Sequence, residues 1–225
     1  RDLKMVVFGQ ADLGAYPRAE AADPLDTNPS AAIAIGEGKY DLFTTIGNPN
    51  EDWLAEFTYA FSWSGGESVS AKGFILPGEE KPVASFSVVS AATPRTPALE
   101  LTEIEWHRVD HHVVGDYTIW SADRLDLDVR DVAFTSDIAV DSQTIGRVSF
   151  VVTNNTAYSY YDPAFFILLK RGPSVVGVNR TTLSSLDSGE TREVAVNWFG
   201  TLPSVGSVEV VPEINLFDLD VYKPL

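Results

Sequence analysis

The chain contains 225 residues, of which 44% are apolar, so it is long enough to bury a sizeable hydrophobic core. Its 32 acidic residues outnumber its 16 basic residues, and the resulting net charge of −16 repels phosphate backbones and anionic lipids. We therefore expect no nucleic acid partner. The chain has no cysteine, which excludes disulfides, thiolate nucleophiles and cysteine-ligated zinc.

No apolar run reaches the roughly 18 residues that a membrane-spanning helix needs. The chain begins at Arg1 rather than at methionine, and no secretory signal is visible in it. We therefore expect a processed product that contacts a membrane only through an anchor outside this chain.

The first predicted strand covers residues 3–8, and a polar, proline-rich segment, residues 14–32, follows it. We expect that segment to be a long insertion loop that is mobile or covers a sheet edge. Residues 40–50 read as a strand, YDLFTTIGNPN, that ends in a corner of Asn48, Pro49 and Asn50. Asn tolerates left-handed backbone angles and Pro presets one angle, so the corner is interpreted as turn chemistry rather than as a ligand site.

The middle of the chain contains a strand in which aromatic residues alternate, residues 57–63, and a glycine turn at Gly78. All three histidines lie in the following segment HRVDHH, residues 107–112. On a strand, His107 and His111 would share one face about 13 Å apart, too far for one metal ion unless the chain turns there. If it turns, two imidazoles and a carboxylate could bind zinc; the alternative is a solvated segment.

The second half begins with residues 123–131, DRLDLDVRD, which alternate as a strand does and place Asp126 and Asp128 on one face. Carboxylates at a domain joint could bind calcium, but no EF-hand spacing is present. The alternative is a solvated strand face that prevents edge-to-edge aggregation. Asn154 and Asn155 then end a strand, and Gly189 marks another turn.

These elements occur twice in one order, at a nearly constant spacing. Leu42 corresponds to Val148, Asn48 to Asn154, and the Gly-Glu turn at Gly78 to that at Gly189. Each copy holds about seven short strands, as an immunoglobulin-like sandwich does. We therefore predict an all-β chain of two tandem immunoglobulin-like sandwiches, residues 1–115 and 122–225, with residues 3–8 and 125–134 as corresponding first strands.

The turn motifs resemble those of known families. The segment LDSGET, residues 186–191, is similar to the turn of the bacterial CARDB-like and FxLYD-like modules, which have the fibronectin III type of sandwich. The corner of Asn48, Pro49 and Asn50 resembles that of the WHy sandwich of water-stress and LEA-type proteins. The first copy also resembles membrane-anchored envelope proteins of small-genome bacteria. The resemblance implies the sandwich fold and an extracellular or cell-surface location, and it brings no catalytic residues.

Chemistry-bearing motifs are sparse in this sequence. No G-x-S-x-G elbow, phosphate-binding glycine loop or acid/base carboxylate pair is recognisable, so we expect no enzyme and no cofactor, with calcium as the one open alternative. Trp53 and Trp120 lie outside the strand patterns and are candidate binding residues, although Trp120 could instead pack the two copies together. We expect a non-catalytic adhesion or protein-interaction module with a protein or surface-glycan partner. The alternatives are a glycan- or calcium-binding module and a WHy-like stress-protective protein.

Overall fold

The computed structural model describes residues 21–140, 143–200 and 203–224. Within these ranges the chain is nearly all β, in several antiparallel sheets, which confirms the all-β prediction. The N-terminal strands are β1 (Asp26–Thr27), β2 (Ala31–Gly36), β3 (Lys39–Gly47), β4 (Trp53–Trp63), β5 (Gly66–Glu67), β6 (Ala71–Ile75), β7 (Glu80–Val89) and β8 (Ala98–Arg108). The later elements are α2 (His111–Val114), α3 (Tyr117–Leu125), β9 (Leu127–Val140), β10 (Gln143–Asn154), β11 (Tyr160–Tyr161), β12 (Ala164–Arg171), β13 (Ser174–Thr182), β14 (Ser185–Leu186), β15 (Thr191–Trp198), β16 (Ser207–Glu213) and the 3₁₀ turn η1 (Leu219–Val221).

The N-terminal strands form two sheets that share one core. In one sheet β3 pairs with β1 and β2 along one edge and with β7 along the other. In the second sheet β4 pairs with β5 and β6 on one side and with β8 on the other. Leu42 and Ile46 of β3 meet Phe57 and Phe61 of β4 in a buried cluster, because alternate residues of each strand point to the same face.

The C-terminal strands repeat this arrangement. One sheet has the order β15-β10-β9, the other has the order β13-β12-β16, and the short β11-β14 ladder lies beside them. Val148 and Phe150 of β10 pack against Phe165 and Ile167 of β12 in a second buried cluster.

Two short strands, β1 and β2, precede β3 in the part of the chain that the structure describes. Asp26 is opposite Gly47 and Ala31 is opposite Phe43, so β1 and β2 pair side by side with β3, in the way that β9 pairs with β10. Residues 3–8, the predicted first strand, lie outside the described residues. The prediction of a loop over residues 14–32 is wrong for β1 and the start of β2, because backbone pairing with β3 stabilises a segment that has little apolar alternation of its own.

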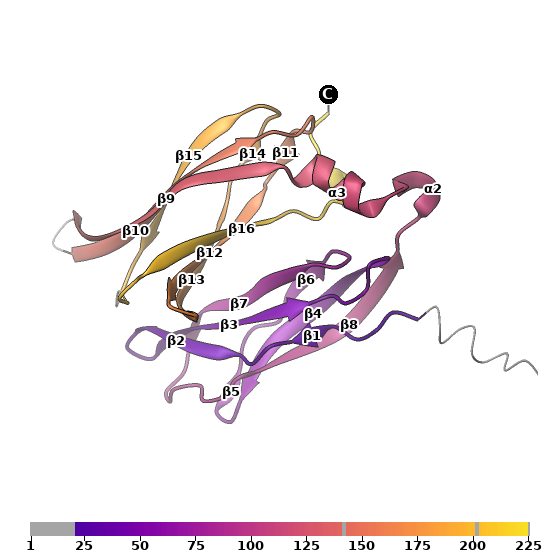
Figure 1. Cartoon of the computed structure of the whole chain (residues 1–225). Coiled ribbons are helices and arrows are strands. Elements are labelled where there is room, and N and C mark those ends of the chain that lie inside the picture. The colour runs from indigo at the N-terminus through magenta and orange to yellow at the C-terminus, as the bar shows by residue number, and fades with distance from the viewer. Residues whose placement is uncertain (1–20, 141–142, 201–202, 225) are drawn as a thin grey trace, which may run out of the picture.

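The two sheet pairs stack face to face, with the β3 sheet against the β12 sheet (Figure 1). Phe43 and Ala84 contact Phe166, Leu168 and Val178 in a third buried cluster. Strand β12 is therefore buried on both faces, which explains its continuous apolar run.

Two helices connect the sheet pairs where the sequence predicted none. The side chain of Asp110 accepts a hydrogen bond from His112 N and caps α2, and that of Asp116 accepts one from Ile119 N and caps α3. These N-caps stabilise helical turns in the segment that joins the two predicted copies. None of the helices in the described part of the chain is both long enough and apolar enough to cross a lipid bilayer.

Candidate functional site

The corner at Asn48 is a saturated hydrogen-bond network. Asn48 is 3% exposed, and its Nδ2 donates to Trp53 O at 2.6 Å and to Leu76 O at 3.0 Å. Its Oδ1 accepts from Asn50 N at 3.0 Å, while Pro49, between them, has no N–H to satisfy. Gly78 N donates to Asn50 O at 3.0 Å, so the corner is joined to the glycine turn. All polar groups of the Asn48 side chain are used inside the protein, which leaves none for a ligand.

The second corner has the same network. Asn154 is fully buried, and its Nδ2 donates to Tyr158 O at 2.7 Å and to Leu186 O at 3.3 Å. Its Oδ1 accepts from Thr156 N at 3.0 Å, and Gly189 N donates to Asn154 O at 2.8 Å. Asn155 is exposed: its backbone N–H donates to Asp126 O at 2.9 Å, and its side chain makes a 3.3 Å contact with the Asp126 carboxylate.

A glutamate completes each glycine turn. Glu79 Oε2 accepts from Leu76 N at 2.7 Å, and Glu190 Oε2 accepts from Asp187 N at 2.7 Å. Gly78 and Gly189 precede them with φ of 65° and 73°, a backbone conformation that glycine adopts most easily. The Gly-Glu motif is therefore a turn that caps its own backbone.

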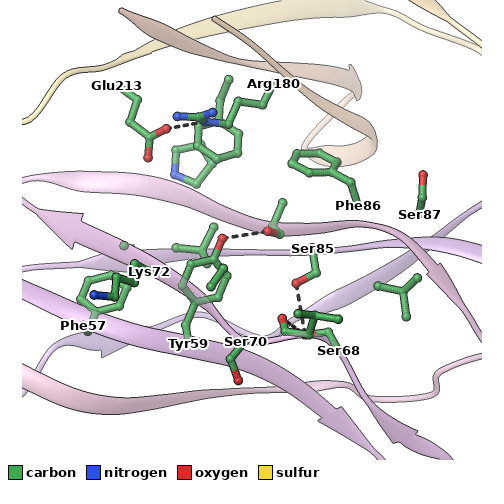
Figure 2. A pocket seen from close by; sticks show the side chains of 18 of the residues that line it. Phe57, Tyr59, Ser68, Ser70, Lys72, Ser85, Phe86, Ser87, Arg180 and Glu213 are labelled. Atoms are coloured by element: carbon green, nitrogen blue, oxygen red, sulfur yellow. Dashed lines mark hydrogen bonds and ion pairs between the residues drawn. The ribbon is translucent and has the colours of Figure 1, made fainter. Parts of the chain in front are cut away.

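A hollow lies on the open side of the N-terminal sheet pair, where it meets the C-terminal pair. It has a volume of about 720 Å³ and lies between β6 and β7, with Phe57 and Tyr59 of β4 in its wall (Figure 2). Tyr59 Oη donates to Ala84 O at 3.0 Å, and the Ser85 hydroxyl donates to that of Ser68 at 3.2 Å. We call this hollow the open-side cleft.

Apolar side chains on the rim of the open-side cleft face solvent. Val69 is 89% exposed, Val89 is 75% exposed and Phe86 is 38% exposed. Single exposed apolar residues are ordinary on a protein surface, but these three all line the same hollow.

The edges beside the cleft are only partly open to a new strand. In the described residues β7 pairs with β3 alone and β6 with β4 alone. Pro82 of β7 has no N–H, and Ala84 O already accepts from Tyr59, so β7 has few free backbone groups. Side-chain packing is therefore the main contribution that the cleft can offer a ligand.

A charge cluster lines the cleft, and in it Lys81 and Glu213 are largely buried whereas Arg180 is exposed. Lys81 Nζ lies 2.6 Å from Glu213 Oε1 and 3.7 Å from the centre of the Phe74 ring, and Arg180 Nε lies 2.7 Å from Glu213 Oε2. Burial alone would raise the pKa of Glu213, but the charges of Lys81 and Arg180 outweigh it and hold that pKa below its usual value. Burial raises the pKa of Glu79, and the positive charge of Lys81 only partly offsets this rise.

The predicted metal residues do not come together as one group. His107 is in β8, with Nε2 3.4 Å from Glu56 Oε2, whereas His111 is in α2, with Nε2 3.1 Å from Asp52 Oδ1. Asp126 is the residue that follows α3 rather than a strand residue, and Asp128 lies in β9 beside Arg130 at 4.0 Å. The prediction of one strand through Asp126 and Asp128 is wrong, because the capped helix α3 extends to Leu125.

The two candidate tryptophans have different surroundings. Trp120 lies in α3 and stacks on Phe217 with ring centres 5.0 Å apart, while the Arg124 guanidinium lies 4.1 Å from its ring centre. It joins the linking helix to the C-terminal segment. Trp53 is partly exposed at the start of β4, with Arg108 5.8 Å from its ring centre.

Sequence reasoning missed the cleft and its charges. One signal was present: Lys81 follows Glu79 by two residues as Arg192 follows Glu190, which indicates a cation beside each glycine turn. The exposed side chains of Phe86 and Val89 gave no such signal in the sequence, because alternation cannot distinguish the core face of a strand from an apolar outer face.

Comparisons with known proteins provide no identity for the chain. No protein-family profile matches it, and no curated protein sequence matches it. Among solved structures, it is similar to red sea bream transglutaminase with a TM-score of 0.27 and 9% identity, over 93% of this chain and 32% of that one. The chain thus spans just under a third of that enzyme's length. A superposition this loose carries no information about fold family or activity.

Proposed function

We propose that this chain is a non-catalytic protein-interaction module of a cell-envelope protein, held outside the cytoplasm by an anchor beyond the chain. In this proposal its two sheet pairs are tandem immunoglobulin-like sandwiches, residues 1–115 and 122–225. The equivalent pairing of β3 with β7 and of β10 with β15, and the matching corner networks at Asn48 and Asn154, support the repeat.

The open-side cleft is the proposed binding site, and the exposure of Val69, Phe86 and Val89 around it is the observation that carries the proposal. The occupant is an extended segment of a partner protein, with apolar side chains that cover these three residues. Residues of β6 and β7 line the hollow along both strands. Grooves of this kind bind peptides by burying alternate side chains.

Charge complementarity defines the partner further. The cleft is lined by three cationic side chains, Lys72, Lys81 and Arg180, and by two carboxylates, Glu67 and Glu213. In a chain of net charge −16, this balance makes the cleft locally positive. Because Lys81 and Arg180 are already paired with Glu213, Lys72 is the cation available to a partner carboxylate. We therefore expect apolar segments that contain at least one acidic residue.

Selection from a displayed library of random peptides tests the proposal. Peptides selected on the wild-type chain should be apolar and acidic and should lose at least tenfold in affinity for V69D and F86S. The replacement V113S is the matched control, because Val113 is 78% exposed but lies in α2, away from the cleft. Amide NMR shifts on binding should concentrate in β6 and β7.

Two outcomes would overturn the proposal. One is the selection of peptides that bind V69D and F86S as tightly as the wild type. The other is a loss of affinity in V113S equal to that in F86S, which would indicate nonspecific adhesion to any exposed apolar residue.

A further inference from the structure

Two carboxylates and an imidazole converge on the outer face of the β4–β8 ladder. Glu56 of β4 is directly opposite Glu105 of β8, and His107 lies two residues further along β8, on the same face. One ligand atom from each of the three lies within 4.8 Å of the others. We propose that these residues bind one first-row divalent transition-metal ion, of which Zn²⁺ is the representative.

The spacing of the donor atoms supports this assignment. Around a tetrahedral Zn²⁺ with bonds of about 2.0–2.1 Å, neighbouring ligand atoms lie about 3.4 Å apart. His107 Nε2 and Glu56 Oε2 are separated by 3.4 Å. Because all three side chains are exposed, small rotations of their outer torsions can bring Glu105 to the same separation.

The electrostatics of the ladder favour a bound cation. Like charges directly opposite each other on adjacent strands destabilise a sheet, and Glu56 and Glu105 are in that relation. A divalent ion between them would convert this repulsion into attraction.

The imidazole determines which ions fit. Ca²⁺ takes six to eight oxygen ligands and Mg²⁺ also prefers oxygen, whereas imidazole nitrogen suits zinc, nickel, cobalt and copper. With one nitrogen and two carboxylates, the cluster matches the second group. The mixed donor set therefore separates this cluster from an ordinary solvated group of acids.

The surroundings leave room to complete the coordination. A hollow of about 620 Å³ borders the cluster, and its polar lining includes Glu56, Glu105, Asn215, Glu103 and the cation Lys72. Asn215 Nδ2 lies 3.4 Å from Glu56 Oε1, on the side opposite to the oxygen that faces His107. Water molecules in the hollow can fill the coordination positions that three protein ligands leave open.

Isothermal titration with ZnCl₂ and visible absorption with CoCl₂ test the assignment on the whole chain. We expect one Zn²⁺ per chain and cobalt absorption bands, with affinity reduced at least tenfold in E105Q and H107N. Two matched controls should bind as the wild type does. E100Q removes an exposed carboxylate of the same strand, β8, where the Ser62 hydroxyl donates a hydrogen bond to Glu100 at 2.5 Å. H111N removes the imidazole that is paired with Asp52. CaCl₂ should produce no heat at the same concentrations.

Because the chain has three histidines, their imidazole NMR signals identify the ligand directly. Zn²⁺ should shift the signal that disappears in H107N and leave the other two in place. The proposal is overturned if the wild type binds no Zn²⁺ at millimolar concentration. It is also overturned if E105Q and H107N bind as tightly as the wild type, since the ion would then be an adventitious ion only. The metal-free variants should unfold at a temperature no lower than the wild type, because the residues are exposed and E105Q relieves the repulsion from Glu56; any loss of binding is then local.

Discussion

Lys81 Nζ lies 2.6 Å from Glu213 Oε1 and joins β7 of the N-terminal sheet pair to β16 of the C-terminal pair. Both side chains are nearly inaccessible to solvent, and Arg180 is the second cation on the same carboxylate. The two sheet pairs are therefore held together by a largely buried ion pair as well as by the apolar cluster that contains Phe43 and Phe166.

Replacing Lys81 by methionine should destabilise the protein by about 3 kcal/mol, the low end for breaking a buried pair, because Arg180 still compensates Glu213. Urea unfolding measures the loss. K170M is the control: Lys170 pairs with Glu209 at the surface, where an ion pair contributes about 0–1 kcal/mol. Equal losses in the two variants would contradict the view that burial makes the Lys81 pair important.

The pH dependence of stability should contain a contribution from Glu213. Its folded pKa is below the unfolded value, because Lys81 and Arg180 outweigh the effect of burial. This contribution is present above the unfolded glutamate pKa and is lost as the pH falls through the lowered folded pKa. E213Q should therefore flatten the acid limb of the unfolding free energy measured between about pH 3 and pH 7.

Glu79 should contribute to the pH dependence of stability with a sign opposite to that of Glu213. Burial raises its folded pKa, so the folded state binds a proton more tightly than the unfolded state does. The stabilisation is present below the unfolded pKa and is lost as the pH rises through the raised folded value. In E79Q this decline in the free energy of unfolding, over the pH interval between the unfolded and folded pKa, should disappear. Comparing the titration curves of the two variants shows whether the signs differ as expected.

Removing either buried corner asparagine should be costly. N48A and N154A each remove two hydrogen bonds from the side-chain amide to backbone carbonyls and leave one backbone N–H, that of Asn50 or Thr156, without its side-chain acceptor. We expect a loss of about 2–3 kcal/mol in urea unfolding. N155A is the matched control, because Asn155 is exposed and its side chain makes one long contact; its effect should stay within about 0.5 kcal/mol. A neutral N154A would show that the network is dispensable.

The glycine turns provide a test of backbone conformation alone. G78A and G189A should each lose about 1–2 kcal/mol, because alanine resists positive φ although no atom lies within 4 Å of the added Cβ. G36A also meets nothing within 4 Å but has no positive φ, so it should not be destabilised. Asparagine at position 78 should cost less than alanine. If G36A loses as much as G78A, backbone angle is not the cause.

The stacking of the two sheet pairs depends on Phe166, which is 4% exposed between them. F166A should cost about 3 kcal/mol as a buried aromatic truncation. F199A, at a side chain that is 63% exposed, should change the free energy of unfolding by less than about 0.5 kcal/mol.

Local chemistry made part of this structure predictable. The turn residues Asn48, Pro49 and Gly78 act on the few backbone groups next to them, so their patterns could be read in a single sequence. Helix α3 was missed because its signal, the cap at Asp116, was weaker than the apolar alternation on either side of it. The position of β1 was missed because its pairing partner, β3, stabilises residues that carry no strand signal of their own.

The sequence by itself determined that this chain is built of short strands and that no cysteine chemistry operates in it, because periodicity and composition need no knowledge of distant contacts. Only the tertiary structure decided which carboxylate each histidine meets, which face of β12 contacts the other sheet pair and where apolar side chains remain exposed. Those relations join residues far apart in the chain, such as Lys81 and Glu213, and are set by packing of whole sheets. No local pattern carries that information.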